Sequence, residues 1–544
     1  MNASGATPAE PSYGIWMLDY EADTQTPIIP GRSGVVITDV ALGYERTAPL
    51  TFYDPQEANG SGVSGFEGNN CMRSKTPLAK LNSATQEELC NGQEGIIHIR
   101  NIYETDGLLS FAGTDMSASY TTVSDPSTTV ADDRPARFLR VVKGVPEPDP
   151  DIRRPDGAVF GRAGAQRMKE ILGYAPIEPD GSVKIRVPAN VPLMVSITDA
   201  DGKRLTARHQ NWLSVRPGEI LECKGCHTRN STEPHGRFYA QPDSTNPGEM
   251  NLNAYNGATP EILSPFTYTV SGEILNATMA ESRFYYIENV LTGAATTMLK
   301  LNQDPRYTFT WLNDGDADPA LTAADMELES TSLERLAAAP WYSNLPTYVA
   351  GDYDLPTNNH CANWNYRCRI RINYPDHIQP LWEFERSNNA SDALPATCIR
   401  CHNRVDEMSA PQVPAGQLEL TNQVDLGIRM RSYEELFFTD VPMEDDGMGN
   451  VVDCTTEVPR VDENGDPVLD ENDMQIIDTV ICPASEGPYV SPNGARASTA
   501  FFSVFAPGGT HEDYMTPAEL RLISEWLDIG GQYYNDLFAA PEAN

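Results

Sequence analysis

Two short motifs in this chain of 544 residues combine residue types and a spacing that suit covalent haem attachment. Residues 223–227 (CKGCH) and 398–402 (CIRCH) each place two thiols three positions apart, with a histidine directly after the second thiol. Thiols at this spacing can add to the two vinyl groups of one haem, and the histidine can then bind its iron. Two of only eight histidines occupy this position, so the pattern predicts two haem c groups rather than zinc knuckles or disulfides. The predicted cofactor-binding residues are Cys223, Cys226, His227, Cys398, Cys401 and His402, with His227 and His402 as proximal iron ligands.

The motifs do not specify the second axial ligand of each iron. Proximity along the chain gives these candidates: His209 and His235 for the first haem, His377 and His511 for the second, and then His360. A methionine, Met408 or Met515, could replace a histidine and would raise the haem potential. A surface or capping role is the alternative for each of these side chains. No catalytic residue is assigned, because the sequence contains no nucleophile elbow, phosphate loop or dinucleotide fingerprint.

The other six cysteines fall into three pairs that are close in sequence: Cys71 with Cys90, Cys361 with Cys368, and Cys454 with Cys482. Six cysteines allow fifteen connectivities, and an oxidising compartment favours disulfides of this local kind. None of the pairs has the CxxC spacing of a zinc site. Cys454 and Cys482 also bracket a predicted hairpin. Its acidic run 462–466 is interpreted as a turn rather than a calcium loop, because Pro467 stands where that loop needs glycine.

The formal net charge of −38 argues against nucleic acid as a partner, because binding phosphate needs a basic surface. The haem motifs instead predict redox proteins as partners. Such a charge also suits a salty habitat or simply a solvated acidic surface. The sequence contains no run of 18 or more apolar residues, so it predicts no membrane span. The first residues lack the features of a secretory signal, whereas haem is attached to CxxCH after export. The chain is therefore expected to be a mature form or a fragment of a periplasmic or extracellular protein.

The elements that position the motifs are expected to be short, because the 40 glycines and 42 prolines interrupt long helices. The expected fold is mixed and β-rich, with a β-sandwich-like middle domain and a more helical, cytochrome c-like C-terminal haem domain. Four regions are predicted: 1–135, β-rich and a candidate propeller remnant; 136–222, β-sandwich-like; 223–354, the first haem c region; and 355–544, the second haem c domain.

Local patterns predict individual elements around both motifs. Asp180-Gly181 and Asp201-Gly202 are expected hairpin turns, next to a half-buried strand over 183–187 and a second strand over 193–198. The capping-box pair Thr516 and Glu519 predicts a helix that begins at Pro517 and is stopped by two glycines, 530–531. A short helix is also predicted over 331–339.

Several stretches resemble the hydrazine synthase alpha subunit and its relatives: 138–142, 179–192, 217–227, 374–381 and 516–528. The resemblance covers roughly 136–230 and 370–535, and it implies an N-terminal propeller, mostly absent here, a β-rich middle domain and a C-terminal dihaem region. In that subunit a tyrosine shortly after the first motif binds the catalytic haem, while the motif histidine binds zinc. The matching residues 228–231 here are Thr-Arg-Asn-Ser, so a haem bound by His227 that only moves electrons is the simpler interpretation.

Three functions fit these motifs. The favoured one is electron transfer between redox partners through two six-coordinate haems. The alternative is a haem redox enzyme with one open, five-coordinate iron: a peroxidase or a nitrogen-compound oxidoreductase of the hydrazine synthase kind. Near an open first haem, Glu219, Glu222, His209 or His235 could act as acid or base. The third is an electron-carrying subunit of a larger assembly.

Overall fold

The computed structural model describes part of the chain, and all structural statements below refer to that part. The described residues are 15–19, 24–29, 88–105, 123–124, 134–164, 168–178, 180–207, 209, 211–227, 267–270, 273–276, 278, 280–281, 284, 299–302, 364, 368–386, 397–425 and 427–542. The chain divides into two compact units, residues 1–70 and residues 71–544. The first unit contributes one antiparallel hairpin, β1 (Ile15–Asp19) and β2 (Thr24–Ile29).

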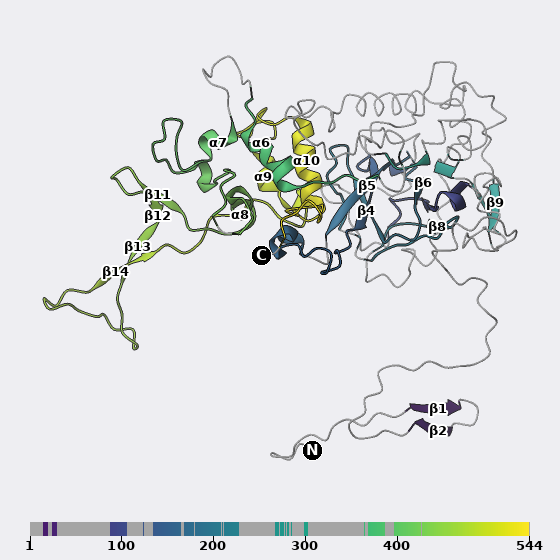
Figure 1. Cartoon of the computed structure of the whole chain (residues 1–544), viewed down its shortest axis with the longest axis horizontal. Coiled ribbons are helices and arrows are strands. Elements are labelled where there is room, and N and C mark those ends of the chain that lie inside the picture. The colour runs from purple at the N-terminus through teal and green to yellow at the C-terminus, as the bar shows by residue number, and fades with distance from the viewer. Residues whose placement is uncertain are drawn as a thin grey trace. The chain divides into compact units, whose positions relative to one another are not determined.

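Two three-stranded sheets form the middle of the second unit (Figure 1). In one sheet the order is β6 (Val183–Pro188), β3 (Glu94–Ile99) and β8 (Ile220–Cys223), with β3 antiparallel to β6 and parallel to β8. In the other the order is β5 (Lys169–Pro176), β4 (Phe138–Gly144) and β7 (Leu193–Thr198), all antiparallel. Apolar side chains from both sheets share one hydrophobic cluster, so the sheets face each other as a small sandwich. The mixed, β-rich fold expected from the sequence is confirmed.

The predicted strand over 183–187 is present, but both of its faces are buried. Val183, Ile185 and Val187 point into the sandwich core. Lys184 and Arg186 lie on the opposite face, and they too are buried. The charge of Arg186 is met by Glu88 at 2.9 Å and Glu94 at 3.7 Å, and a buried charge needs such partners. The expectation of a half-buried strand is therefore wrong, because paired charges cover its second face.

The two predicted turns have different roles. Asp201-Gly202 closes a turn at the end of β7, where the Gly202 N–H donates to the Asp199 carbonyl and Thr198 pairs with Arg204. Asp180-Gly181 does not close a hairpin, because β5 before it and β6 after it belong to different sheets. That turn instead carries the chain from one layer of the sandwich to the other. A short hairpin, β9 (Thr267–Val270) and β10 (Glu273–Asn276), lies further along the chain.

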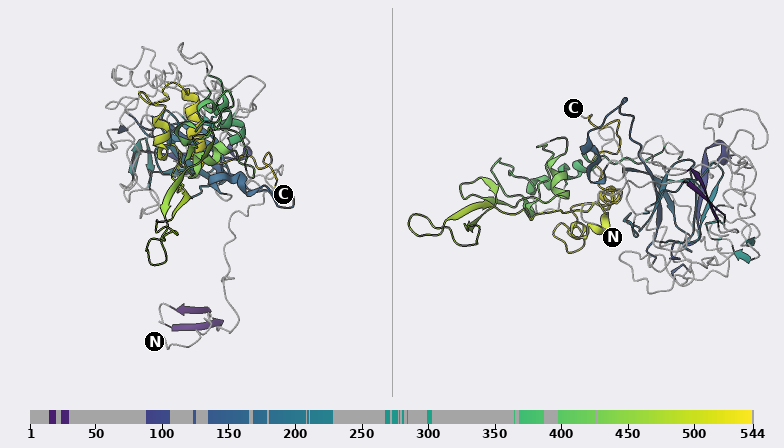
Figure 2. Two further views of the ribbon diagram at one scale, coloured as in Figure 1. Left: turned by 90° about the vertical axis from the view of Figure 1, so that its left-hand side faces the viewer. Right: turned by 90° about the horizontal axis from the view of Figure 1, so that it is seen from below.

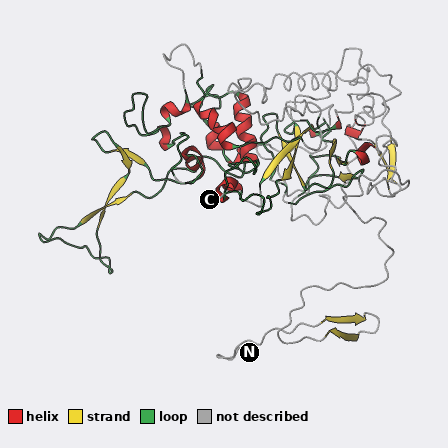
Figure 3. Cartoon of the chain, in the orientation of Figure 1, coloured by secondary structure: helices red, strands yellow, loops and turns green. Residues whose placement is uncertain are grey.

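Helices predominate after residue 370 (Figure 3). They are the π-helical turn η10 (Tyr374–Ile378), α6 (Gln379–Glu383), α7 (Cys398–Cys401), α8 (Arg431–Phe437), α9 (Thr499–Ser503) and α10 (Pro517–Asp528). The helix α10 begins and ends where the sequence predicts, with the capping box of Thr516 and Glu519 formed. Its apolar side chains join one core with Phe138, Ile171 and Tyr174 of the second sheet. The helical part and the sandwich therefore share buried surface.

An arm made of two antiparallel hairpins leaves the helical part between residues 443 and 482, and it is called the β arm here. It contains β11 (Met443–Asp445), β12 (Val451–Asp453), β13 (Thr455–Pro459) and β14 (Ile477–Ile481). Figures 1 and 2 show it extending away from α7 and α8. A disulfide between Cys454 and Cys482 closes the base of the β13–β14 hairpin. The predicted hairpin is thus confirmed.

Several predicted features fall on other parts of the chain. Cys90 and Cys368 are each disulfide-bonded, but their predicted partners Cys71 and Cys361 lie outside the described residues. His235, His360 and the helix predicted over 331–339 also lie outside them. Within the described part of the chain, no helix has the length and apolar character needed to cross a bilayer.

Candidate haem-binding sites

The second motif occupies a single helical turn. Its thiols sit at the two ends of α7, and neither Cys398 nor Cys401 is disulfide-bonded. His402 follows as the C-cap, and its Nδ1 lies 3.0 Å from the Leu418 carbonyl oxygen. If Nδ1 donates its proton to that carbonyl, Nε2 is the nitrogen left to bind a metal. Burial lowers the pKa of His402, and so does the neighbouring His511. A neutral imidazole is the form that binds iron.

His511 lies opposite His402, as one of the two leading predictions for the second site requires. The centroids of the two rings are 6.0 Å apart, and their planes differ by 35°. Two imidazoles that bind one metal from opposite sides, with metal–nitrogen distances of about 2.0–2.1 Å, have ring centres about 6 Å apart. The His511 Nδ1 lies 2.8 Å from the Thr510 hydroxyl, which leaves its Nε2 available as well. These observations fit a haem c held between the two rings.

A buried ion pair lies behind Cys398. The Arg386 guanidinium contacts the Cys398 sulfur at 3.7 Å and the Glu519 carboxylate at 2.5 Å. Glu519 is fully buried, and its other oxygen accepts from the backbone N–H of Thr516 in the capping box of α10. Burial raises the pKa of the Cys398 thiol, and the positive charge of Arg386 opposes that effect. The start of α10 is thereby tied to the haem-attachment helix.

The first motif continues directly from the end of a strand. Cys223 ends β8 and pairs with Ile99 of β3. The Cys226 N–H donates to the Glu104 carbonyl at 2.8 Å, so the motif runs alongside residues 100–105. A Cβ atom on Gly225 would come within 2.3 Å of that carbonyl oxygen, so only glycine fits this position. Burial raises the pKa of Cys223 to about 11, with Glu222 adding to the effect. Neither Cys223 nor Cys226 is disulfide-bonded.

A partly buried acid–base cluster lies beside this first motif. His98 of β3 is buried, and its Nδ1 lies 3.5 Å from the carboxylate of Glu222, the residue before Cys223. Glu281 completes the cluster, at 4.0 Å from His98 and 3.7 Å from Arg100. Burial alone would raise the pKa of Glu222, but the hydrogen bond and charge of His98, with Arg100 nearby, lower it overall. The cluster can therefore hold an ionised carboxylate within the protein interior.

The structure also brings His209 toward the first motif. Its Nδ1 lies 2.6 Å from the Asn211 carbonyl oxygen. Burial lowers the pKa of His209, and the charge of His227 lowers it further, which places the two histidines within electrostatic range. His209 also lines a cavity of about 10 Å³ with Arg140 and Asp528, room for about one water molecule. Of the two candidate ligands for the first haem, only His209 can be located, since His235 lies outside the described residues.

Three other predicted ligands lie elsewhere. His377 is buried in the turn η10, where its Nδ1 accepts from the Asn373 N–H at 2.9 Å. Met408 is 86% exposed on a surface loop. Met515 is buried in the apolar core that surrounds α10. None of the contacts of these side chains in the described structure joins them to His402, whereas His511 contacts it directly.

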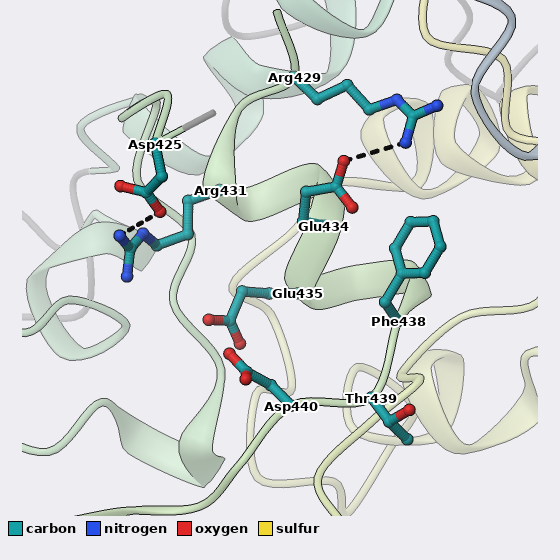
Figure 4. A pocket seen from close by; sticks show the side chains of 8 residues that line it. All are labelled: Asp425, Arg429, Arg431, Glu434, Glu435, Phe438, Thr439 and Asp440. Atoms are coloured by element: carbon teal, nitrogen blue, oxygen red, sulfur yellow. Dashed lines mark hydrogen bonds and ion pairs between the residues drawn. The ribbon is translucent and has the colours of Figure 1, made fainter. Parts of the chain in front are cut away.

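A pocket lies on α8 and is linked to the second motif by a salt bridge. Its volume is about 420 Å³, and Figure 4 shows the eight side chains that line it. Glu435 and Asp440 point toward one another there, while Asp425 pairs with Arg431 and Glu434 with Arg429. Burial raises the pKa of Glu435 to about 7, and the charges of Asp440 and Glu419 add to this effect.

That pocket is connected to the motif through Arg404, two residues after His402. The Arg404 guanidinium lies 2.7 Å from Glu419 and 4.0 Å from Glu435. A change of charge at the motif would therefore be felt electrostatically at Glu435. Elsewhere in the described residues, no three His, Cys, Asp or Glu side chains converge in a way that could hold a metal ion.

Sequence reasoning named both motifs, His209, His511 and Glu222 as candidates, but it missed most of the side chains that pair around them. Arg386 and Glu519 are 133 positions apart, and His98 and Glu222 meet only because β3 pairs with β8. The position of Glu222 directly before Cys223 was the one local signal for the second cluster. Long-range pairing of this kind leaves no local pattern.

The fold and the sequence define a mixed, β-rich protein with two CxxCH motifs. The particular relationship comes from residues 137–228, which match the family described as "Hydrazine synthase alpha subunit middle domain". This range contains β4 to β8 and the whole first motif. The chain therefore carries a domain related to that middle domain.

Comparison with solved structures finds the hydrazine synthase of Kuenenia stuttgartiensis, at 13% identity and a TM-score of 0.32. The alignment covers 82% of this chain and 43% of that one, so this chain spans less than half the length of the matched protein. No curated protein sequence matches the chain. The relationship accordingly rests on residues 137–228.

Proposed function

We propose that this chain is an exported dihaem oxidoreductase, in which a small molecule reacts at the first haem and electrons pass through the second. The observation that carries the proposal is that the domain related to the hydrazine synthase alpha subunit includes the first motif. The substrate class we propose is a small nitrogen compound or a peroxide. Haem iron at such a site supplies a reversible change of oxidation state and a place for a small ligand to bind.

At the first site, the chain itself would attach the cofactor through Cys223 and Cys226 and bind its iron through His227. The cluster of His98, Glu222 and Glu281 would supply proton transfer, because Glu222 is kept ionised and lies 3.5 Å from a histidine that can carry the proton. His98 and Glu281 are buried, whereas the Glu222 side chain is 25% exposed and can exchange protons with solvent. The cluster lies next to the motif because Glu222 directly precedes Cys223 in the chain.

At the second site, Cys398 and Cys401 would hold a cofactor whose iron is bound by His402 and His511. Two histidine ligands leave no position for substrate, and this suits electron transfer. The Leu418 carbonyl and the Thr510 hydroxyl would fix the orientation of the two rings. We further propose that this region adopts a cytochrome c-like arrangement, in which α10 packs against the cofactor and Arg386 supports its start.

A second candidate function is electron transfer alone, with both irons six-coordinate. The electrostatic effect of His227 on His209 is the observation that favours it, because a second histidine bound to the first iron would close that iron to substrate. In this case the chain would be an electron carrier or the electron-carrying subunit of a larger complex. We propose a periplasmic or extracellular location for either function. The disulfide between Cys454 and Cys482 supports an oxidising compartment.

One experiment separates the two functions. The electron paramagnetic resonance spectrum of the oxidised holoprotein is recorded first, and carbon monoxide is then added to the reduced protein. The oxidoreductase predicts one low-spin and one high-spin iron, with carbon monoxide bound to half of the haem. Two low-spin irons that ignore carbon monoxide would instead establish the electron carrier.

A further inference from the structure

The β arm exposes apolar side chains that nothing in the described structure covers. Among the described residues, 16 large hydrophobic side chains are exposed, and nine of them lie in the 40 residues of the arm. They are Met448, Val452, Val458, Val461, Leu469, Met474, Ile477, Val480 and Ile481. Ile477 and Ile481 on β14 are 54% and 61% exposed, and Met474 near the tip is 64% exposed. Apolar exposure at this density is typical of a surface that binds another protein.

The arm is held in one conformation by features that do not need a core. The disulfide closes the hairpin at a Cα–Cα distance of 5.4 Å. At three turns an aspartate carboxylate accepts two backbone N–H groups each: Asp446, Asp462 and Asp470. A two-stranded ribbon without a core is marginally stable by itself. The arm has no buried core to hold it in one conformation, and the disulfide and these turns do so instead.

The charge of the arm indicates what it can bind. Residues 443–482 contain twelve acidic side chains and one basic side chain, Arg460, so the arm carries a net charge of −11. Hydrogen bonds lower the pKa of Asp446, Asp462 and Asp470, so these groups stay ionised in mildly acidic conditions. A second copy of the chain, with its net charge of −38, would be repelled. A cationic protein would be attracted.

The strands present both binding chemistries together. In the register of β13 and β14, Ile477 and Ile481 lie on one face, together with Glu457 of the opposing strand. Among the described strands, β13 and β14 pair with each other alone, so their outer edges carry no partner strand there. An open strand edge can pair with a segment of another protein. Apolar contact, backbone pairing and negative charge are thus available on one element.

We propose that the β arm is a docking element for a cationic protein partner. An apolar patch of that partner, bordered by lysine and arginine, packs against Ile477 and Ile481. The inference does not depend on which chemistry the haem sites perform. It uses only the exposure, the charge and the open edges of residues 443–482.

The test uses the holoprotein and a defined probe, a small lysine-rich c-type cytochrome, with binding measured by titration calorimetry. In an arm-deleted variant, residues 455–481 are replaced by Asn-Gly and both flanking cysteines by serine, since a two-residue turn joins strand ends this close. Deletion should weaken binding at least about tenfold. Unchanged affinity would overturn the proposal.

Charge and apolar contact are tested separately. The triple variant Glu457→Gln, Glu463→Gln, Glu471→Gln is compared with Glu147→Gln, Asp201→Asn, Asp513→Asn, which removes the same charge from exposed positions outside the arm. Only the arm variant should weaken binding. An equal loss in both would mean that the probe responds to overall charge, and the proposal would be wrong.

The apolar variant is Ile477→Thr with Ile481→Thr, which keeps residues that favour strands. At about 150 mM salt, where charge is screened beyond about 8 Å, it should still weaken binding several-fold. Wild-type rates of backbone amide hydrogen exchange in residues 455–481 show that the arm remains folded. Arm-dependent dimerisation in sedimentation velocity would make the occupant a second copy and would contradict the proposal.

Discussion

At the scale of single residues, the second site depends on the pairing of His402 with His511. The 6.0 Å between their rings is set by local contacts: the Leu418 carbonyl orients one ring, and the Thr510 hydroxyl orients the other. Cofactor binding between them would need no large rearrangement of either ring. The site is therefore already arranged for two nitrogen ligands.

Replacing His511 by alanine should convert the second haem from low spin to high spin and let it bind carbon monoxide, because one axial position opens. The matched control is His377→Ala, since the His377 ring bonds to Asn373 within its own turn. Magnetic circular dichroism of the oxidised protein measures the change. If His377→Ala opens the haem and His511→Ala does not, the ligand assignment is reversed.

Glu435 should make stability depend on pH in a specific direction. Burial raises its folded-state pKa from 4.5 to about 7, so the folded state binds this proton more tightly than the unfolded chain does. The stability that Glu435 contributes is fully present below pH 4.5 and is lost as the pH rises through about 7.

The variant Glu435→Gln cannot ionise, so it should match the wild type near pH 4.5 and exceed it at pH 8. We expect an excess of about 1–2 kcal/mol, less than the full shift implies because the pocket opens to water. Urea unfolding at a series of pH values measures the difference, with Glu434→Gln as the control for the amide substitution. A constant difference across the series would contradict the prediction.

At the scale of elements, Gly225 governs how closely the first motif approaches residues 100–105. Gly225→Ala should reduce haem attachment at the first motif severalfold, because the added Cβ would lie 2.3 Å from the Glu104 carbonyl oxygen. Gly157→Ala is the matched control, since a Cβ there meets nothing within 4 Å. Haem content per protein, from the pyridine haemochrome spectrum, measures the effect. Equal content in both variants would show that this close approach is not needed.

The elements also show how far the sequence could predict this structure. The helix α10 has local signals at both ends, and it forms where they indicate. The parallel pairing of β3 with β8 joins residues more than 120 positions apart and has no local signature. For the same reason Arg186 of β6 was expected to face solvent, whereas it is buried and paired with Glu88 and Glu94. Motif residues were predictable because haem attachment requires a contiguous sequence, and their supporting ion pairs were not.

At the scale of the whole molecule, one buried ion pair joins the sandwich to the helical part. Arg140 of β4 lies 2.8 Å from Asp528 at the end of α10, and both side chains are 1% exposed. The same carboxylate accepts from the Arg204 N–H. Arg140 and Asp528 also line the small cavity that His209 lines. The ion pair therefore lies next to His209 as well as at the end of α10.

Arg140→Met should lower the free energy of unfolding by about 3–5 kcal/mol, because it leaves the Asp528 carboxylate buried without its main cation. Arg371→Met removes a comparable pair with Asp536, but Arg371 is 40% exposed, and the expected cost is about 0–1 kcal/mol. Differential scanning calorimetry compares the two variants. Equal costs would mean that the pair does not hold the two parts together.

We propose that this chain binds two haem groups covalently, one at each motif. The most direct test is the intact mass of the protein produced with a secretion leader in a host that matures c-type cytochromes. The mass should exceed that of the polypeptide by two haem groups, and by one in a Cys398→Ala, Cys401→Ala variant. A bare polypeptide mass, or a CxxC disulfide at either motif, would contradict the account.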